Sequence, residues 1–386
     1  AMSRDLRAID SSDHQSLTSA LAAALDGAGP AVFPRSSLTY SELPTSVDSQ
    51  VALVIETSGS SSRPKRVWHT AESLQAAADQ VNDELDGSGL WWNALPCHYI
   101  AGVMVVVRAL RSTSEVIAKN PRHSIGDSLL TFDQKANESS PSVPRFTSLV
   151  PKQLSDLISA AAGDHDTAEA LRRFSRILVG GQRVPNLLMT KAEELGLRVT
   201  KTYGSAETAG GCVWDGKPLS QSEVAVIDGR IALSGPMLAG GYLGDPEKTD
   251  RSFVMQGSKH WFITDDLGEI KDGRVQVHGR ADRVIVSGGE KTSLDEVEEA
   301  LGAEFPSMDL ATVSVVDATW GEAIGVISNS ELERPAVQGF LRERFGRATQ
   351  VAWTKTVPEL PYLSSGKINR AELERLVTSA TDVDSS

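Results

Sequence analysis

The order of apolar runs and helix-period stretches constrains the fold of this chain more than any other sequence feature. Between residues 51 and 202, short apolar runs alternate with stretches whose apolar residues recur at helical spacing. One helical face after the first run is formed by Leu74, Ala78, Val81 and Leu85. Strands that alternate with helices in this way predict an α/β domain with a largely parallel sheet.

The pattern changes after about residue 220. The dipeptides Asp228-Gly229 and Asp272-Gly273 each separate two short apolar runs, which predicts two hairpins and an antiparallel section. From about residue 283 the sequence predicts a small α+β unit, with helices near 294–301, 335–345 and 371–378 and strands near 311–316 and 323–327. The polar, serine-containing stretch 125–144 is interpreted as a surface loop. We therefore expect a large domain over residues 1–280 and a small one over residues 281–386.

Composition excludes several classes of protein. The 386 residues carry 38 basic and 51 acidic side chains, a net charge of −13, so a general nucleic-acid binder, which needs a basic face, is not expected. No apolar run approaches the roughly 18–20 residues that cross a bilayer. Two cysteines, Cys97 and Cys212, are too few for a disulfide framework or a zinc site. We expect a soluble cytoplasmic enzyme or binding protein without a membrane span.

A loop rich in small hydroxyl residues follows the buried run 51–55. It reads Thr57-Ser58-Gly59-Ser60-Ser61-Ser62-Arg63-Pro64-Lys65-Arg66. Such a loop lets backbone N–H groups and hydroxyls surround phosphate oxygens, while Lys65 supplies positive charge. A flexible polar turn is the alternative.

Two later segments combine carboxylates with turn residues. Glu207 closes Tyr203-Gly204-Ser205-Ala206-Glu207 and is a candidate ligand for Mg²⁺, which prefers oxygen ligands. A solvated loop glutamate is the alternative. Asp265 and Asp266 lie at the end of a predicted strand, where one carboxylate is a candidate to accept hydrogen bonds from a ribose diol. An ordinary turn is the alternative.

Two segments near the small domain complete the set. Gly279-Arg280-Ala281-Asp282 leads to Ser287-Gly288-Gly289-Glu290, which is either a hinge or an exposed linker. Near the end of the chain, Lys367 lies in the segment Ser365-Gly366-Lys367-Ile368. This lysine is a candidate functional residue, and a solvated surface lysine is the alternative.

Together, and in this order, the five segments resemble the adenylate-forming superfamily of acyl- and aryl-CoA synthetases, luciferases and peptide-synthetase adenylation domains. The resemblance covers residues 51 to 376. Ser62 and Arg66 replace family glycines, Ala206 replaces a threonine, and Asp265 replaces the glycine before the ribose-binding aspartate. None of these differences removes a charged group of the motifs.

The resemblance implies ATP, Mg²⁺ and coenzyme A as ligands, a mobile small domain, and a role for each motif residue. It assigns phosphate binding to Thr57, Ser58, Gly59, Ser60, Ser61 and Lys65, and nucleotide binding to Gly180, Gly181, Gln182, Tyr203 and Gly204. The resemblance also implies that Glu207 and Thr57 bind Mg²⁺ and that Asp266 and Arg280 bind the ribose. It implies that Lys367 and Glu207 are catalytic. Asp282 is expected to be the hinge, and Gly288 and Gly289 are expected to line the coenzyme A channel.

Three stretches are similar to the o-succinylbenzoate–CoA ligases of menaquinone biosynthesis: 95–102 with Arg108, 146–154, and 287–290. This similarity implies an acid pocket lined by His98, Tyr99 and Ser205, with Arg108 paired to the carboxylate that is not activated. The alternatives are a surface arginine and an ordinary half-buried histidine.

Three other functions stay open at this stage. The alternatives are a CoA ligase for another carboxylic acid, a stand-alone adenylation domain that loads a carrier protein, and a nucleotide-binding protein without catalysis. Retention of the charged motif residues argues against the last. The sequence does not fix the oligomeric state and leaves a homodimer open.

Overall fold

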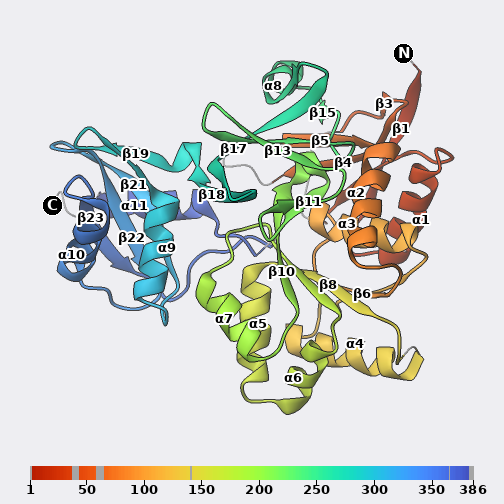
Figure 1. Ribbon diagram of the computed structural model, residues 1–386, viewed down its shortest axis with the longest axis horizontal. Helices are drawn as coiled ribbons and strands as arrows, with labels where there is room; N and C mark the ends of the chain where they lie inside the picture. The colour runs from red at the N-terminus through yellow and green to blue at the C-terminus, as the bar shows by residue number, and fades with distance from the viewer. Residues whose placement is uncertain (1, 37–42, 58–64, 140, 365, 382–386) are drawn as a thin grey trace. The chain divides into compact units, whose positions relative to one another are not determined.

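The computed structural model describes residues 2–36, 43–57, 65–139, 141–364 and 366–381, and of residues 377–381 only the backbone. The chain divides into two compact units (Figure 1). The first comprises residues 1–184, 188–225 and 232–263, and the second comprises residues 185–187, 226–231 and 264–386. Among the described residues, no helix is both long and apolar enough to cross a membrane.

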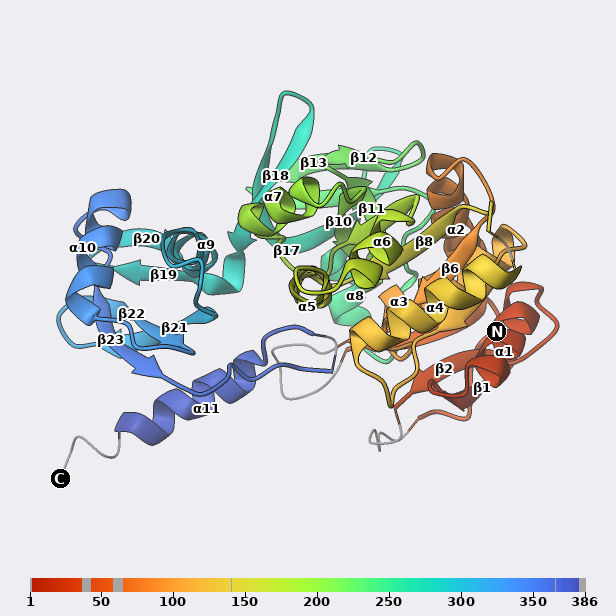
Figure 2. The ribbon, with the colours of Figure 1, turned by 90° about the horizontal axis from the view of Figure 1, so that it is seen from below.

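A first sheet of the large unit has the strand order β15-β5-β4-β2-β1-β3. Its strands are β1 (Ser3–Asp10), β2 (Ala31–Arg35), β3 (Ser46–Asp48), β4 (Val51–Thr57), β5 (Lys65–Thr70) and β15 (Gly241–Tyr242), accompanied by α1 (His14–Leu25) and α2 (Ala71–Glu84). Strands β1, β2 and β4 are parallel, whereas β5 is antiparallel to β4. Helix α1 lies beside β2 (Figure 2). The predicted apolar face of α2 is buried, as expected.

A second sheet has the order β12-β11-β10-β9-β8-β6-β7. Its strands are β6 (Leu90–Asn93), β7 (Glu115–Ala118), β8 (Arg145–Leu149), β9 (Arg176–Val179), β10 (Val199–Ser205), β11 (Gly210–Trp214) and β12 (Lys217–Pro218), and its helices are α3 (Ile100–Arg111), α4 (Ile125–Ser139), α5 (Pro151–Ala161), α6 (His165–Arg172) and α7 (Asn186–Glu194). The five strands β7, β6, β8, β9 and β10 are parallel, and β11 and β12 are antiparallel. The predicted parallel α/β section is confirmed.

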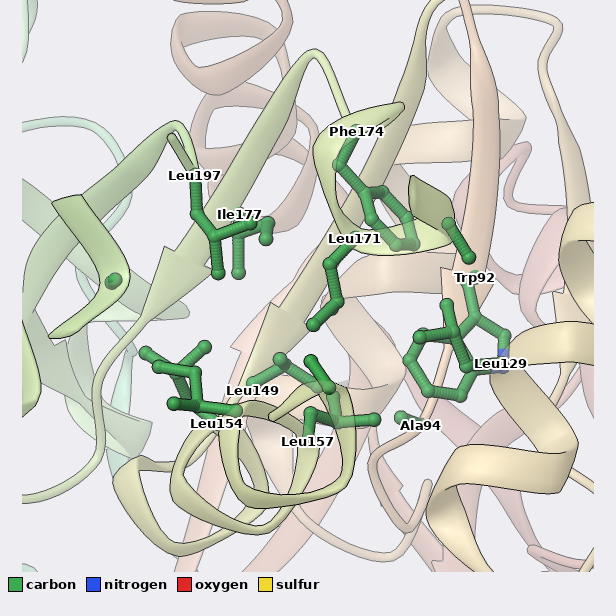
Figure 3. Packing of buried hydrophobic residues seen from close by; sticks show 14 of the residues in the cluster. Trp92, Ala94, Leu129, Leu149, Leu154, Leu157, Leu171, Phe174, Ile177 and Leu197 are labelled. Carbon is green, nitrogen blue, oxygen red and sulfur yellow. The ribbon is translucent and has the colours of Figure 1, made fainter. Parts of the chain in front are cut away.

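Helices α4, α5 and α6 bury their apolar faces against this sheet. Trp92 of β6 packs with Leu129, Leu149, Leu157 and Phe174 in one cluster (Figure 3). The rings of Phe132 and Phe174 are parallel, 5.5 Å apart between centroids. This cluster fixes the carboxyl ends of β8 and β9, which precede segments predicted to bind ligands.

The prediction of a surface loop over residues 125–144 is wrong, because residues 125–139 form helix α4. Leu129, Phe132 and Ala136 recur at helical spacing and are buried. The polar appearance of the stretch misleads because Asp133 is buried too. Its carboxylate pairs with Arg145 at 2.5 Å and with Arg173 at 2.7 Å, and both partners come from elsewhere in the sequence.

A third sheet has the order β13-β14-β17-β16, with β18 paired to β17. It consists of β13 (Glu223–Ile227), β14 (Arg230–Ser234), β16 (Phe253–Gln256), β17 (Lys259–Lys271) and β18 (Arg274–Arg280), and α8 (Pro246–Ser252) precedes β16. The predicted Asp-Gly turns at 228–229 and 272–273 both separate neighbouring strands and have positive φ at both positions. The predicted hairpins are confirmed.

The second unit contains a sheet of order β20-β19-β22-β21, with β23 parallel to β22. Its elements are β19 (Val284–Ser287), β20 (Glu290–Ser293), α9 (Leu294–Glu304), β21 (Leu310–Asp317), β22 (Gly321–Ser328), α10 (Arg334–Phe345), β23 (Val351–Thr356) and α11 (Arg370–Thr381), preceded by the short turn η2 (Ala281–Arg283). The predicted small α+β unit is confirmed, with its helices and strands near the expected places.

An ion-pair network inside the second unit centres on Glu298 of α9. Arg370 donates to its two carboxylate oxygens at 2.7 and 3.0 Å, and Arg283 donates to Oε2 at 3.1 Å. The backbone N–H of Thr312 donates to the same oxygen at 2.8 Å. The network therefore joins the turn η2 to the start of α11, three residues after Lys367.

We expect Glu298→Gln to destabilise this unit by about 3 kcal/mol at pH 7, since two partly buried guanidinium groups lose their counter-ion. Burial would raise the pKa of Glu298, but the charges and hydrogen bonds of Arg370 and Arg283 outweigh it and hold the pKa below its usual value. The carboxylate thus contributes stability that is present above the unfolded pKa of about 4.3 and is lost as the pH falls below it. Urea unfolding should show wild type and variant converging from pH 7 to pH 3. An equal difference at both pH values would contradict the prediction.

Candidate active site

The ends of the predicted phosphate loop are held by two paired strands. Thr57 ends β4 and Lys65 begins β5, and these residues are cross-strand partners. Arg66 pairs with Glu56 of β4 at 3.1 Å, so its guanidinium has a counter-ion in the sheet. The predicted phosphate ligands Ser58, Gly59, Ser60 and Ser61, and Ser62 with them, lie outside the described residues.

The predicted nucleotide segments follow neighbouring parallel strands. Gly180, Gly181 and Gln182 come directly after β9, and Tyr203 and Gly204 lie in the last part of β10. Carboxyl ends of neighbouring parallel strands meet at one edge of a sheet, where α/β proteins bind ligands. A side chain at Gly204 would stand 2.0 Å from the carbonyl oxygen of Gly210, so only glycine fits there. The structure brings these two segments together.

Glu207 lies in a short 3-10 turn, η1 (Ala206–Thr208), between β10 and β11. The side chain of Ser205 caps this turn by accepting the backbone N–H of Glu207 at 3.2 Å. Glu207 is 8% exposed, and its Oε1 accepts a hydrogen bond from the Tyr242 hydroxyl at 2.8 Å. The alternative of a solvated loop glutamate is therefore excluded.

Two residues of this environment were not predicted from the sequence. His69 of β5 is completely buried and contacts the carbonyl oxygen of Ala206 through Nε2 at 2.7 Å. Tyr242 of β15 reaches Glu207 because β15 pairs with β5. The sequence signal is weak, since both residues become neighbours of Glu207 only through contacts between distant segments.

The segment before helix α3 carries two of the predicted acid-pocket residues. His98 is half-buried, its Nδ1 lies 3.3 Å from the hydroxyl of Ser11, and burial lowers its pKa. Its ring packs on Tyr99 with 4.2 Å between centroids. Tyr99 occupies the N-cap position of α3 and gives the helix no side-chain cap. His98 and Tyr99 thus form one aromatic pair at the helix start.

Arg108 lies on the buried side of α3 and not on a surface face. It is 5% exposed, and burial lowers the pKa of its guanidinium to about 10. Nη1 donates to the hydroxyl of Ser148 at 3.3 Å, and the guanidinium carbon lies 5.8 Å from the ring centroid of Trp91. Nε has no hydrogen-bond partner, and no carboxylate among the described residues pairs with the side chain. A Cβ on Gly210 would be 3.5 Å from Nη2. A buried cation without a counter-ion is suited to an anionic ligand.

In the second unit, the predicted ribose ligands form a charged group. Arg280 donates to both carboxylate oxygens of Asp282, at 2.9 and 2.8 Å. Asp265 and Asp266 lie 3.5 and 3.9 Å from the same guanidinium, and Asp265 also pairs with Arg230 at 3.0 Å. The hydrogen bond with Asp282 raises the pKa of Arg280. Burial would raise the pKa of Asp282, but Arg280 outweighs it and holds that pKa below its usual value.

The other predicted residues of this unit lie in tight turns. Gly288 and Gly289 form the two-residue turn between β19 and β20, and both have positive φ, at 57° and 85°. Lys367 lies in a narrow turn where its carbonyl oxygen accepts the N–H of Leu363 at 2.7 Å. Tyr362 and Ile368 pair across the base of this turn. These backbone interactions fix the main chain at Lys367 independently of its side chain.

Known proteins are similar to this chain over most of its length. A family profile described as AMP-binding enzyme matches residues 6–243. A probable 2-succinylbenzoate–CoA ligase of Mycobacterium tuberculosis is 34% identical over 346 residues, covering 87% of this chain and 87% of that protein. The 2-succinylbenzoate–CoA ligase of Geobacillus kaustophilus is 26% identical over 391 residues, covering 92% and 76%.

Solved structures share the fold. The o-succinylbenzoate CoA synthetase (MenE) of Bacillus subtilis, in complex with the acyl-adenylate intermediate OSB-AMP, aligns with a TM-score of 0.72 at 22% identity, over 92% of this chain and 81% of that chain. ATP-bound MatB from Rhodopseudomonas palustris aligns with a TM-score of 0.74 at 20% identity, over 96% and 79%. The predicted fold class, α/β with a smaller C-terminal α+β part, is confirmed.

Proposed function

The chain belongs to the AMP-binding enzyme family, and from that premise we propose that it activates 2-succinylbenzoate with ATP and transfers the acyl group to coenzyme A. The relatives named above support this substrate. The observation that carries the proposal is Arg108, a buried guanidinium that, within the part of the chain that the structure describes, has no hydrogen-bond partner at Nε and pairs with no carboxylate. A substrate with two carboxylates offers one group for activation and a second as the partner of Arg108.

The phosphate-binding role falls to Thr57 and Lys65 with the loop between them, and the adenine lies along Gly180, Gly181 and Gln182 near Tyr203 and Gly204. Asp266, assisted by Arg280, binds the ribose hydroxyls. His98, Tyr99 and Ser205 line the acid pocket beside Arg108. The adjacency of β9 and β10 supports this arrangement, because it puts the adenine segment and the Glu207 turn at one sheet edge.

Glu207 is the proposed ligand of Mg²⁺, together with Thr57. The described residues contain no group of three or more His, Cys, Asp or Glu that would hold a metal alone. This fits an ion that is held by one or two carboxylates and the phosphates of the substrate. Tyr242 occupies one oxygen of Glu207 and leaves the other for the ion. When bound, Mg²⁺ neutralises phosphate charge.

In the first half-reaction, the carboxylate of the acid attacks the α-phosphorus of ATP and displaces pyrophosphate. The protein supplies positioning and charge complementarity, since no covalent intermediate with a side chain is needed. Lys367 neutralises the charge that develops at the phosphorus. Arg108 holds the second carboxylate, so that only one carboxylate of the acid reaches the phosphorus.

In the second half-reaction, the coenzyme A thiolate attacks the acyl-adenylate, forming the thioester and releasing AMP. Lys367 is not needed in this step. We propose that residues 281–386 act as a mobile lid that turns about Asp282 and brings Gly288 and Gly289 toward the pantetheine. The ion pair between Arg280 and Asp282 supports the hinge, because both side chains are about half exposed and the pair can exchange without disturbing an apolar core.

We expect Asp282→Pro to slow thioester formation from supplied acyl-adenylate by roughly tenfold or more while adenylate formation is less affected, because proline fixes φ at the hinge. The matched control is Asp282→Ala, which also loses the ion pair with Arg280 but keeps backbone freedom. Single-turnover kinetics of both half-reactions measure the difference. Equal slowing by the proline and alanine variants would show that the carboxylate, and not hinge rotation, matters.

The function is tested by ATP–pyrophosphate exchange with a panel of acids, followed by detection of the CoA thioester. Exchange with 2-succinylbenzoate and formation of its thioester are the expected results. Exchange with a benzoate, a cinnamate or a fatty acid instead would indicate a ligase for another acid. Transfer to a carrier protein and not to coenzyme A would indicate a stand-alone adenylation domain.

A cytoplasmic location belongs to the same proposal, since ATP and coenzyme A are cytoplasmic substrates. Both cysteines, Cys97 and Cys212, are free and buried, which agrees with a reducing compartment.

A further inference from the structure

The turn that carries Glu207 is tied to strand β5 by a buried histidine. Nε2 of His69 lies 2.7 Å from the carbonyl oxygen of Ala206, and Nδ1 lies 3.2 Å from the hydroxyl of Ser73. A carbonyl oxygen only accepts, so Nε2 carries the hydrogen, and in the neutral ring Nδ1 is left as an acceptor beside the Ser73 hydroxyl, which also reaches the carbonyl oxygen of Thr70 at 3.2 Å. Burial lowers the pKa of His69 to about 4, so the ring is neutral near pH 7. The ring therefore serves as a fixed donor to the peptide before Glu207.

A second tie comes from β15, which pairs with the same strand. Tyr242 is the cross-strand partner of Val67, and its hydroxyl donates to Glu207 Oε1 at 2.8 Å. Just before β15, the N–H of Ala239 donates to the carbonyl oxygen of Glu207 at 2.8 Å. The backbone and the carboxylate of Glu207 are thus both fixed relative to β5, whose first residue is Lys65 at the end of the phosphate loop.

We propose that His69 and Tyr242 are positioning residues. They hold the Glu207 carboxylate at a fixed place relative to strand β5, so that one metal ion reaches both the carboxylate and the nucleotide phosphates. This inference rests on the proposed role of Glu207. Mg²⁺ requires near-ideal octahedral geometry, so a displaced carboxylate binds it poorly. Partners behind a metal ligand typically change metal affinity about 10- to 100-fold when removed. Neither residue is assigned a contact with substrate.

The first test measures metal binding without turnover. Mn²⁺ serves as the probe, and its dissociation constant in the presence of a non-hydrolysable ATP analogue is measured by electron paramagnetic resonance. We expect His69→Leu, which leaves the Ala206 carbonyl without its donor, and Tyr242→Phe, which removes only the hydroxyl, to weaken Mn²⁺ binding about tenfold. His69→Gln, whose amide N–H replaces the Nε2 donor, should restore affinity to within about threefold. The control His165→Leu makes the same change at an exposed position of α6 and should bind Mn²⁺ as wild type does.

The second test separates the half-reactions. In pyrophosphate exchange, His69→Leu and Tyr242→Phe should raise the Mg²⁺ concentration for half-maximal rate about tenfold, with a much smaller change in KM for the acid. Thioester formation from supplied acyl-adenylate should stay near the wild-type rate. Unchanged Mn²⁺ affinity in Tyr242→Phe, or equal slowing of both half-reactions, would overturn the inference. If wild type shows no exchange with 2-succinylbenzoate, the substrate assignment fails, and the Mn²⁺ measurement still decides this inference.

Discussion

Lys367→Ala should lower the rate of adenylate formation by roughly 10³-fold or more, which is the largest effect that we expect from any single change in this chain. Charge develops at the α-phosphorus as pyrophosphate leaves, and an ammonium group aimed at it stabilises the transition state. The backbone turn that carries Lys367 is braced by the hydrogen bond between Leu363 N–H and the Lys367 carbonyl, at 2.7 Å, which does not depend on the side chain. Truncation should therefore remove the charge and leave the turn intact.

The same variant should convert supplied acyl-adenylate and coenzyme A to thioester at close to the wild-type rate. Single-turnover measurements of the two half-reactions give both numbers on one preparation. Lys367→Arg is the matched control, because it keeps a positive charge but changes its reach and geometry, so an intermediate rate is expected. If Lys367→Ala slows both half-reactions equally, the lysine is structural or the two steps share one domain arrangement.

Sequence patterns predicted the fold correctly wherever the local pattern of apolar residues matches the residues that are buried in the structure. The run Val51–Ile55, the face of α2 and the two Asp-Gly turns each specify their own element, and all form as predicted. Helix α4 was missed because its polar residues are stabilised from a distance. Asp133 counts as a loop residue in a local window, yet Arg145 and Arg173 bury it in an ion pair. A window of sequence contains no information about those partners.

The candidate site shows the same division. Glu207 and Arg108 were predicted from segments that resemble those of known families, but the sequence left open whether either side chain is buried or solvated. His69 and Tyr242 carry no motif in the sequence, because they reach Glu207 only after β15 pairs with β5 and the turn at 206–208 folds against them. Residues that position a functional group through tertiary contacts are therefore the part that sequence patterns do not reveal.

Arg108→Ala should raise KM for 2-succinylbenzoate about 10- to 100-fold and leave KM for ATP nearly unchanged. The expected loss corresponds to about 1.5–3 kcal/mol for a hydrogen bond to a charged group. The guanidinium is buried against Trp91 and has no carboxylate partner among the described residues, so the substrate would supply its counter-ion. Truncation also removes volume from a packed region, which makes Arg108→Met the better matched variant, because it keeps length and loses charge. Both variants should give the same selective rise in KM.

A second test uses an analogue of the acid that keeps the carboxylate to be activated and lacks the other one. Wild type should use the analogue poorly, since the buried guanidinium would again be left without a partner. Arg108→Met should lose the preference between the acid and the analogue, and the non-additive effects of changing protein and substrate would measure the contact between them. Pyrophosphate-exchange kinetics of both enzymes with both acids provide the four rates. If the preference survives in Arg108→Met, or if KM for ATP rises as much as KM for the acid, then Arg108 is not the partner of the second carboxylate.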